Sequence, residues 1–171
     1  ALSGTASTLT MINSTVSNNT GAVDNNAIAT EGMATLFNSI VFGNTASGSH
    51  TYAYSLLQGN SDTSDGNIDA TELSPGDIFN APGTDYTLKE SAPVIDKGNN
   101  VLFPGLDGLS TDLAGNARVY NYSWSGVIDM GAFESSYKGT PTDDPNPGDT
   151  THTIYVKTVA TGTGDGSTWE D

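Results

Sequence analysis

Apolar and polar residues alternate in short runs along the first third of the chain, and glycine, asparagine and serine separate these runs. Such runs, rich in β-branched residues, are typical of strands that end in tight turns. No helical period and no helix caps of useful length occur here, so strands are favoured. The predicted strands cover residues 8–12, 27–29, 34–37, 39–42 and 52–57. Alternation predicts six inward residues, although a slip of one residue would invert the set: Leu9, Met11, Val16, Leu36, Ile40 and Leu56.

An internal repeat lies within these runs. The segment NSTVSNNT, which begins at Asn13, matches NSIVFGNT, which begins at Asn38, in its Asn-Ser start, its valine and its Asn-Thr end. The spacing from Asn13 to Asn38 fits one coil of a parallel β-helix. At that period Asn13 stacks on Asn38, and Asn19 stacks on Asn44. Stacked asparagines can pass amide hydrogen bonds from coil to coil, so the repeat predicts an asparagine ladder.

Further along the chain, its only arginine, Arg118, is flanked in sequence by Asp112, Asp129 and Glu134. A guanidinium makes bidentate, charge-assisted hydrogen bonds with carboxylates and suits burial better than a lysine does. One interpretation is a structural knot that closes the end of a fold. The other is an acid/base or metal site in which Asp129 and Glu134 are the working carboxylates. The structural interpretation is favoured, because buried ion-pair networks perturb carboxylates as readily as catalysis does.

Three motifs around this cluster occur in the order seen in a known family. SAPVIDKG at residues 91–98 precedes TDLAGNARV at residues 111–119, and VIDMGAFE follows at residues 127–134. Over residues 56–134 the chain resembles the choice-of-anchor Q domain of bacterial surface proteins. The resemblance implies a domain that closes the C-terminal end of a right-handed parallel β-helix of the pectate-lyase-like superfamily. It also implies a cell-surface location, and it adds Asp96 of the first motif to the predicted cap residues.

Composition narrows the classes of function. The chain carries 20 acidic and five basic residues and a net charge of -15, and the part before Ser61 contains no lysine or arginine and only Asp24 and Glu31 as acids. Without a basic patch, nucleic acid and acidic lipid surfaces are excluded as partners. A hydrophobic content of 35% is low for an ordinary core but suits a solenoid. No cysteine is available for disulfides or thiolate metal sites.

No apolar run is long enough to span a bilayer, and no signal peptide begins at Ala1, so we expect no direct membrane insertion. We also expect the chain to be a piece of a longer protein. No cofactor is predicted, with calcium left as an alternative in an acidic loop whose spacing does not fit an EF-hand. The four candidate calcium ligands are Asp62, Asp65, Asn67 and Asp69; otherwise the loop is simply solvated.

The predicted organisation has four parts. Terminal β-helix coils cover residues 1–60, an irregular β cap residues 61–138, a Pro- and Gly-containing linker residues 139–151, and the first strand of a following repeat residues 152–171. This last strand can add to an open sheet edge of the same or another molecule, and an exposed β-helix end is a second route to self-association. Within the cap, residues 77–95 are predicted as irregular strands with five buried anchors: Phe79, Tyr86, Leu88, Val94 and Ile95.

The predicted function is a non-catalytic structural or adhesive module of a secreted or cell-surface protein, with a glycan or a host surface as its partner. An aromatic platform for a glycan is predicted from Tyr52, Tyr54, Tyr120, Tyr122 and Trp124, although aromatic residues at a cap more often pack. The alternative is a fragment of a polysaccharide lyase or glycoside hydrolase of the β-helix type. Two acids and no base on the coil wall argue against such an enzyme.

Overall fold

The computed structural model describes residues 8–19, 26–120 and 126–136, which all fall within one compact unit of residues 1–139. Strands predominate over helices in the described chain, so the predicted all-β class is confirmed. The first part of the chain forms two parallel sheets. Sheet A contains β1 (Thr8–Ile12), β3 (Asn26–Phe37) and β5 (Thr45–Ala53) in that order. Sheet B contains β2 (Thr15–Ser17), β4 (Ile40–Phe42), β6 (Leu56–Leu57) and β7 (Ile68–Asp69) in that order.

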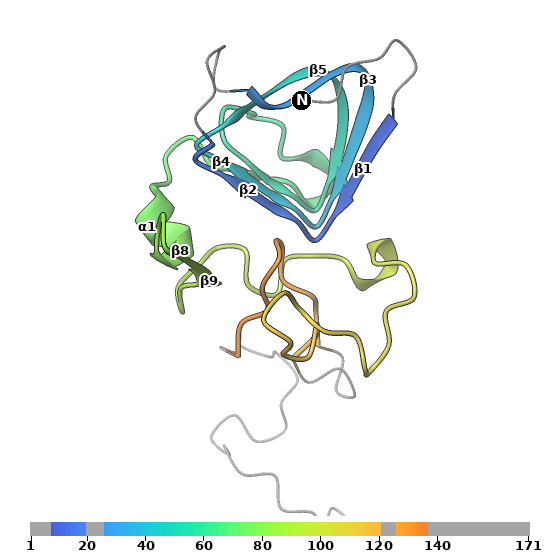
Figure 1. Cartoon of the computed structure of the whole chain (residues 1–171), viewed down its shortest axis with the longest axis vertical. Helices are drawn as coiled ribbons and strands as arrows, with labels where there is room; N and C mark the ends of the chain where they lie inside the picture. Colours follow the sequence, from blue (N-terminus) through green and yellow to red (C-terminus); the bar gives the residue numbers. More distant parts are fainter. Residues whose placement is uncertain (1–7, 20–25, 121–125, 137–171) are drawn as a thin grey trace, which may run out of the picture. The chain divides into compact units, whose positions relative to one another are not determined.

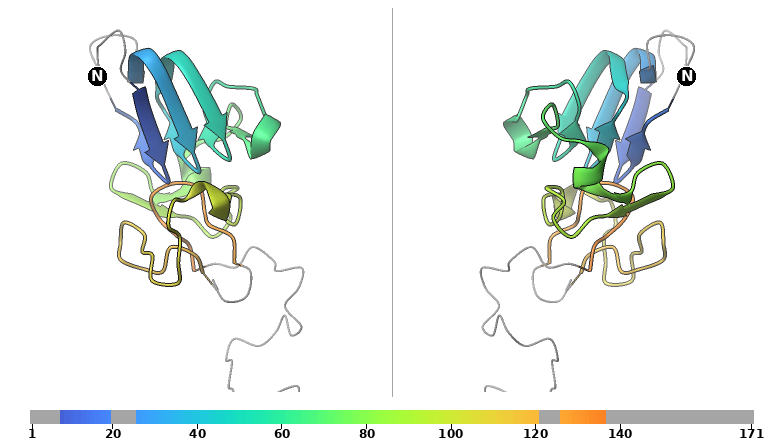
Figure 2. Two further views of the ribbon diagram at one scale, coloured as in Figure 1. Left: turned by 90° about the vertical axis from the view of Figure 1, so that its right-hand side faces the viewer. Right: turned by 90° about the vertical axis from the view of Figure 1, so that its left-hand side faces the viewer.

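From β1 to β6 the chain alternates between the two sheets, so that each turn adds one strand to sheet A and one to sheet B, and β7 then adds a fourth strand to sheet B alone. In Figure 1, which looks along the stack, β1, β3 and β5 overlie one another on one side and meet β2 and β4 at a corner. Figure 2 shows the strands of successive turns side by side. Ile12 pairs with Phe37, which matches the spacing from Asn13 to Asn38, whereas the step from Phe37 to its partner Ala53 is shorter. The predicted period therefore describes the first turn only.

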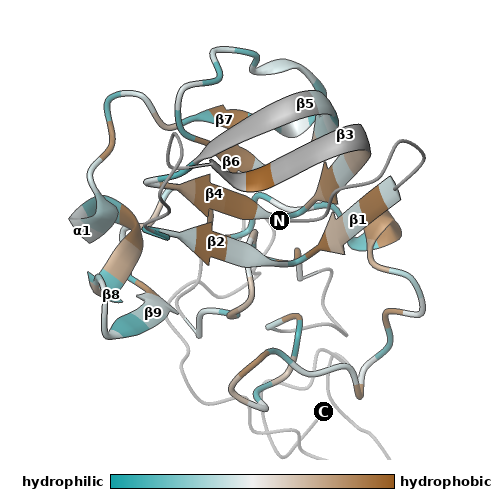
Figure 3. Ribbon diagram, turned by 45° about the horizontal axis from the view of Figure 1, so that its top comes forward, coloured by the Kyte–Doolittle hydropathy of each residue, from teal (hydrophilic) through white to brown (hydrophobic). Residues whose placement is uncertain are grey.

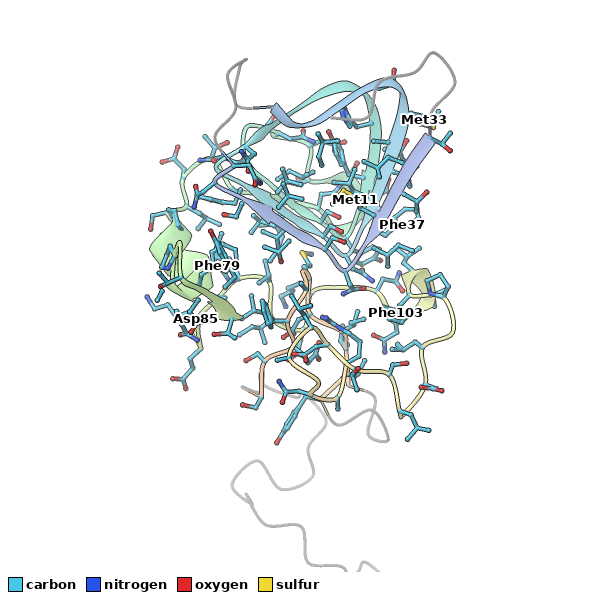
Figure 4. The ribbon with its side chains drawn as sticks, in the orientation of Figure 1. Met11, Met33, Phe37, Phe79, Asp85 and Phe103 are labelled. Carbon is cyan, nitrogen blue, oxygen red and sulfur yellow. The ribbon has the colours of Figure 1, made fainter. Side chains whose placement is uncertain are left out.

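The space between the two sheets is apolar. Its buried residues are Ile28, Ala34, Leu36, Val41 and Leu57, and partly buried Leu9, Met11, Val16 and Tyr52 pack against them. Met11 points into this space in Figure 4. The inward orientation predicted for Leu9, Met11, Val16 and Leu36 is therefore confirmed.

Two of the predicted inward residues, Ile40 and Leu56, face the other way. Both are fully buried, but they belong to a second apolar cluster that also holds Phe79 and Met130 of the cap. Val41 and Leu57, one position along, point inward instead. The prediction assumed that the alternation which points Leu36 inward continues unchanged through the turn. The left-handed residues at the turns, Asn38 and Tyr54, shift this alternation by one position. Figure 3 shows that β4 is apolar along its length, as burial of both faces requires.

We use the term cap for the described part of residues 61–136, which covers the outer face of sheet B through this second cluster. Apart from β7, which belongs to sheet B, its elements are η1 (Ser64–Gly66), α1 (Pro75–Ile78), β8 (Phe79–Ala81), β9 (Asp85–Leu88) and η2 (Asn100–Leu102). Each of the η elements is a single 3-10 turn. β8 and β9 pair as an antiparallel hairpin. Most of the remaining cap consists of turns, so backbone groups there need partners other than a sheet.

The short helix α1 was not predicted, because residues 77–95 were expected to form irregular strands only. Pro75 at its first position fixes a helical φ, and the carboxylate of Asp77 accepts a hydrogen bond from the backbone N–H of Ser74 at 2.8 Å. The five predicted anchors are correct: four are buried and Tyr86 packs partly buried against their cluster. The predicted linker 139–151 and strand 152–171 lie outside the described residues, and the boundary between residues 60 and 61 stays a prediction.

Candidate functional site

The corner between the two sheets is built on residues in the left-handed conformation. Asn13, Asn38 and Tyr54 directly follow strands of sheet A and have φ values of 45°, 49° and 51°. Asparagine is one of the few residues that adopts this conformation readily, because its short polar side chain can bond locally. The repeat therefore carries asparagine at the positions where the chain must turn from one sheet to the other.

The predicted asparagine pairs are brought together. Nδ2 of Asn38 donates a hydrogen bond to Oδ1 of Asn13 at 3.2 Å, and both residues are buried. At the far end of sheet B, Nδ2 of Asn19 donates to Oδ1 of Asn44 at 3.2 Å, and Nδ2 of Asn44 donates to the carbonyl oxygen of Asn19 at 2.7 Å. Each pair spans 25 residues of sequence, as the repeat predicts.

A second ladder, which the sequence reasoning missed, runs beside the first. The backbone N–H of Ser14 donates to Oγ of Ser39 at 3.2 Å, and that of Ser39 donates to Oγ of Ser55 at 3.1 Å. The N–H of Ser55 donates in turn to Oδ1 of Asn67 at 3.1 Å. The signal for the first step was the serine that follows each repeated asparagine. The later steps leave no repeat in the sequence, because the sequence separation between bonded residues falls from 25 to 16 and then 12.

The asparagine corner also binds the cap. Oδ1 of Asn38 accepts a hydrogen bond from the N–H of Asn99 at 2.8 Å, and its Nδ2 donates to the Asn99 carbonyl at 3.0 Å. Nδ2 of Asn13 donates to the carbonyl of Asp129 at 2.9 Å. The N–H of Gly131 completes the contact by donating to the carbonyl of Asn38 at 2.7 Å. Two corner side chains thus hold two separate segments of the cap backbone.

Gly131 shows how closely the cap approaches this corner. Its φ is +94°, and a Cβ atom there would lie 2.7 Å from Cδ1 of Ile40 and 2.8 Å from Oγ1 of Thr15. The next residue, Ala132, donates its N–H to the same Thr15 hydroxyl at 3.0 Å. A side chain at position 131 would therefore force the cap away from the coil.

Arg118 is buried in the cap, with its side chain 2% exposed. Its Nη2 donates to Oε2 of Glu134 at 3.1 Å, in an ion pair whose carboxylate side chain is 3% exposed. The same nitrogen donates to the carbonyl oxygens of Asp129 at 3.1 Å and Phe133 at 3.4 Å. The guanidinium therefore joins a carboxylate and two backbone carbonyls that come from one segment of the cap.

The carboxylates of the cluster accept hydrogen bonds from backbone N–H groups. Glu134 accepts from the N–H of Tyr120 and of Asp129, both at 3.0 Å. Asp129 accepts from the N–H of Asp96 at 2.7 Å and of Ser135 at 2.6 Å. These bonds tie together cap segments that have no sheet partners, so the carboxylates take the place of a sheet ladder.

Asp112 binds its own turn and one more segment. Its Oδ1 accepts from the N–H of Ala114 at 2.9 Å and of Asn116 at 2.8 Å, and its Oδ2 accepts from the N–H of Glu134 at 2.9 Å. The structure thus brings the five predicted cap residues into one connected network. Asp96 joins it through its backbone N–H to Asp129.

The electrostatics of this network oppose full ionisation. Burial raises the pKa of Glu134 to about 8 and the pKa of Asp129 to about 6, and a neighbouring carboxylate adds to each rise. Arg118 and the backbone N–H groups act in the opposite direction on both pKa values, and burial lowers the pKa of Arg118 itself. Each carboxyl pKa is higher in the folded chain than the value near 4 expected when unfolded. Their contribution to stability is therefore complete below about pH 4 and is lost as the pH rises through 6 and 8.

Such pKa values fall in the range that general acids and bases use, but the geometry does not suit catalysis. The side chain of Glu134 is 3% exposed and Asp129 is 1% exposed. A substrate cannot reach carboxyl oxygens that are buried and already hydrogen-bonded to the backbone. The arrangement suits a structural knot better than an acid/base site.

The calcium candidates do not converge. Asp62 accepts from the N–H of Ser64, and Asp69 accepts from the N–H of Thr71. Asn67 is the last member of the serine ladder and donates its Nδ2 to the carbonyl of Tyr52 at 3.3 Å. Within residues 8–19, 26–120 and 126–136, no group of three or more acidic or histidine side chains could hold a metal ion.

The predicted aromatic platform is not assembled in the described residues. Tyr52 packs against the apolar space between the sheets and stacks on His50 with ring centroids 5.7 Å apart. Tyr54 is partly buried against the second apolar cluster, and Tyr120 is 38% exposed. The other two members, Tyr122 and Trp124, lie outside the described residues.

Comparisons with protein-family models, with curated proteins and with solved structures found no match for this chain. No helix among the described residues has both the length and the apolar character that a membrane crossing requires. The functional conclusion therefore depends on the geometry of the corner and of the cap network.

Proposed function

We propose that this chain closes the end of a right-handed parallel β-helix and is a non-catalytic structural or adhesive module of a secreted or bacterial cell-surface protein. The proposal is supported by two parallel sheets that one chain builds in turn, with asparagines of successive turns stacked in register. A stack of coils ends in unpaired backbone groups and an open apolar interior. The cap supports such a role, because it covers the outer face of sheet B and bonds to the corner of the first two turns.

The observation that carries the proposal is the use of the asparagine corner by the cap. Asn38, which is fully buried, bonds to the preceding coil through Asn13 and to the cap through both the N–H and the carbonyl of Asn99. The side chain of Asn38 thus makes hydrogen bonds with both the preceding coil and the cap. A corner that joins coil and cap in this way fixes the cap against the coils, and it leaves no polar atom of that side chain for a ligand.

The non-catalytic part of the proposal is supported by the burial of the cap carboxylates. A lyase or glycoside hydrolase needs carboxylates that can reach a sugar ring. Here Asp129 and Glu134 are buried, and their oxygens accept N–H bonds from Asp96, Tyr120 and Ser135. The location outside the cell rests on the three motifs that resemble the choice-of-anchor Q domain. A glycan or a host surface is the partner that the adhesive form of the proposal implies.

An activity screen on the full chain tests the proposal. The chain is incubated with a panel of polysaccharides while reducing ends and unsaturated products are measured, and it is applied in parallel to a glycan array. No turnover is expected, and binding on the array would separate an adhesive from a purely structural role. Turnover that disappears in Asp129→Asn but persists in Asp107→Asn, a variant at an exposed carboxylate, would overturn the proposal.

A further inference from the structure

Three asparagines of the sequence begin the pattern Asn-X-Ser/Thr in which X is not proline: Asn13, Asn18 and Asn121. This pattern marks asparagines that transferases link to a sugar through Nδ2, and such sugars are bulky and stand on the surface. Asn121 lies outside the described residues. The other two asparagines lie at the two ends of strand β2, so their surroundings can be compared directly.

Asn13 is already occupied by structural contacts. It is buried at the corner between the sheets, and its Nδ2 donates to the carbonyl oxygens of Asp129 at 2.9 Å and Gly131 at 3.4 Å. Its Oδ1 accepts a hydrogen bond from Asn38. A sugar on Nδ2 replaces one of its two N–H bonds, so it would remove a contact with the cap. Asn13 therefore does not suit a transferase in the folded chain.

Asn18 has a fixed backbone and a free side chain. It directly follows β2, its φ is 51°, and its N–H donates to the carbonyl oxygen of Phe42 at 3.0 Å. The residue is exposed, and its side-chain amide makes no hydrogen bond with the residues that the structure describes. The side chain lies over Gly43 of the next turn, where a Cβ atom would collide with Oδ1 of Asn18.

The internal repeat shows that the amide of Asn18 is not needed for the fold. In the repeat, Asn18 aligns with Gly43, which adopts the same left-handed conformation with a φ of 67° and no side chain. Asn13 and Asn19, by contrast, each bond to an asparagine of the next turn. The side chain of Asn18 is therefore the one asparagine side chain of this repeat unit that is left for another partner.

We infer that Asn18, and not Asn13, accepts an N-linked sugar in the folded chain. Thr20 completes the Asn-X-Thr pattern in the sequence and lies outside the described residues. The inference rests on the proposed location outside the cell, and it adds a modification site to the proposed module. The sugar would hydrate a surface that has no charged residue from Thr8 to Asn19.

The donor is a sugar whose anomeric carbon carries a phosphate leaving group. Nδ2 of Asn18 forms the bond to the anomeric carbon as the bond from that carbon to the phosphate oxygen breaks. The phosphate group leaves with the electron pair of the broken bond, and a base of the transferase takes one proton from the amide. The step needs no oxidant or reductant.

The test compares the folded full chain with a synthetic peptide of residues 8–24, in which neither asparagine is held by a fold. Both are incubated with UDP-glucose and a soluble transferase that glucosylates asparagine in this pattern, and the modified residues are mapped by mass spectrometry. In the peptide we expect glucose on both Asn13 and Asn18. In the full chain we expect glucose on Asn18 and none on Asn13.

Three variants of the full chain serve as controls. Asn18→Gln and Thr20→Ala are expected to abolish the glucose at position 18, because each destroys the pattern there. Asn121→Gln removes the third pattern and is expected to leave the modification of Asn18 unchanged. The glucosylated chain is expected to keep the Tm of the unmodified chain, since the amide of Asn18 makes no hydrogen bond that the sugar would displace.

A full chain that accepts no glucose at Asn18, under conditions in which the peptide accepts it there, would overturn the inference. Glucose on Asn13 of the full chain would do the same, because it would show that the fold does not select between the two sites. The polysaccharide and glycan-array assays use the unmodified chain, so failure here is distinguishable from failure of the proposed function.

Discussion

Replacement of Arg118 by alanine removes the one cation of the buried cap network. The guanidinium loses its ion pair with Glu134 and two hydrogen bonds to the carbonyls of Asp129 and Phe133. Removing one partner of a buried ion pair costs about 3 to 5 kcal/mol, because the other charge stays buried without its counter-ion. We expect Arg118→Ala to destabilise the chain by up to about this amount, and by most above pH 8, where Glu134 is ionised in the unmodified chain.

The pH dependence of this loss identifies its cause. Without Arg118, which lowers the pKa of Glu134, that pKa rises further above its value of about 8. Glu134 then takes up a proton and becomes neutral as the pH falls, which relieves the buried charge. The destabilisation is therefore expected to be smaller at pH 5 than at pH 8.

Urea unfolding at the two pH values measures these differences. Lys97→Ala is the matched control, because it removes the same charge from an exposed position of the same cap. The reasoning is refuted if Arg118→Ala unfolds within about 0.5 kcal/mol of Lys97→Ala at pH 8, which is the usual range for surface substitutions. Equal losses at pH 5 and pH 8 would show that the cost is not that of an uncompensated carboxylate.

Three further outcomes are expected. The Tm of the unmodified chain should fall by about 4 °C or more from pH 5 to pH 8, because the raised pKa values of Asp129 and Glu134 mean that the stability these carboxyl groups contribute is lost as the pH rises. A Tm that rises over this range in a thermal melt would contradict this expectation. Asn38→Ala should lower the free energy of unfolding in urea by at least about 2 kcal/mol more than Asn18→Ala does. Both residues have positive φ, but only Asn38 is buried with hydrogen bonds to the coil and the cap. Equal losses would show that the Asn38 side chain does not stabilise the corner. Gly131→Ala should lower the Tm more than Gly105→Ala, because both have positive φ but only position 131 places a Cβ against Ile40 and Thr15; similar melts would show that the cap does not approach so closely.

The sequence predicts the parts of this fold that repeat in register. The spacing of the repeat was enough to pair Asn13 with Asn38, because one parallel coil follows another at constant length there. It did not reveal Ser55 or Asn67 as ladder members, since the coils shorten and the residue type changes at the last step. Ile40 and Leu56 were assigned to the wrong cluster, because alternation does not continue through a left-handed corner.

The cap was predictable as a cluster but not as a network. The sequence placed Arg118 among Asp112, Asp129 and Glu134, and attraction between opposite charges is enough to expect contact. The contact between Asn38 and Asn99 spans 61 residues and involves backbone atoms of Asn99, which leave no pattern in the sequence. Which side chain meets which backbone group depends on the path of the turns, and short-range rules do not specify that path.

Native-state hydrogen exchange tests most directly whether the cap and the coils are one structure joined at the asparagine corner. The amides of Gly131 and Asn99, which bond to Asn38, are expected to exchange with the same free energy as the coil amides of Ile40 and Leu56. In Asn38→Ala the two cap amides are expected to exchange faster than the coil amides. Cap amides that exchange in the unmodified chain as fast as an unfolded peptide, while the coil amides stay protected, would contradict the account.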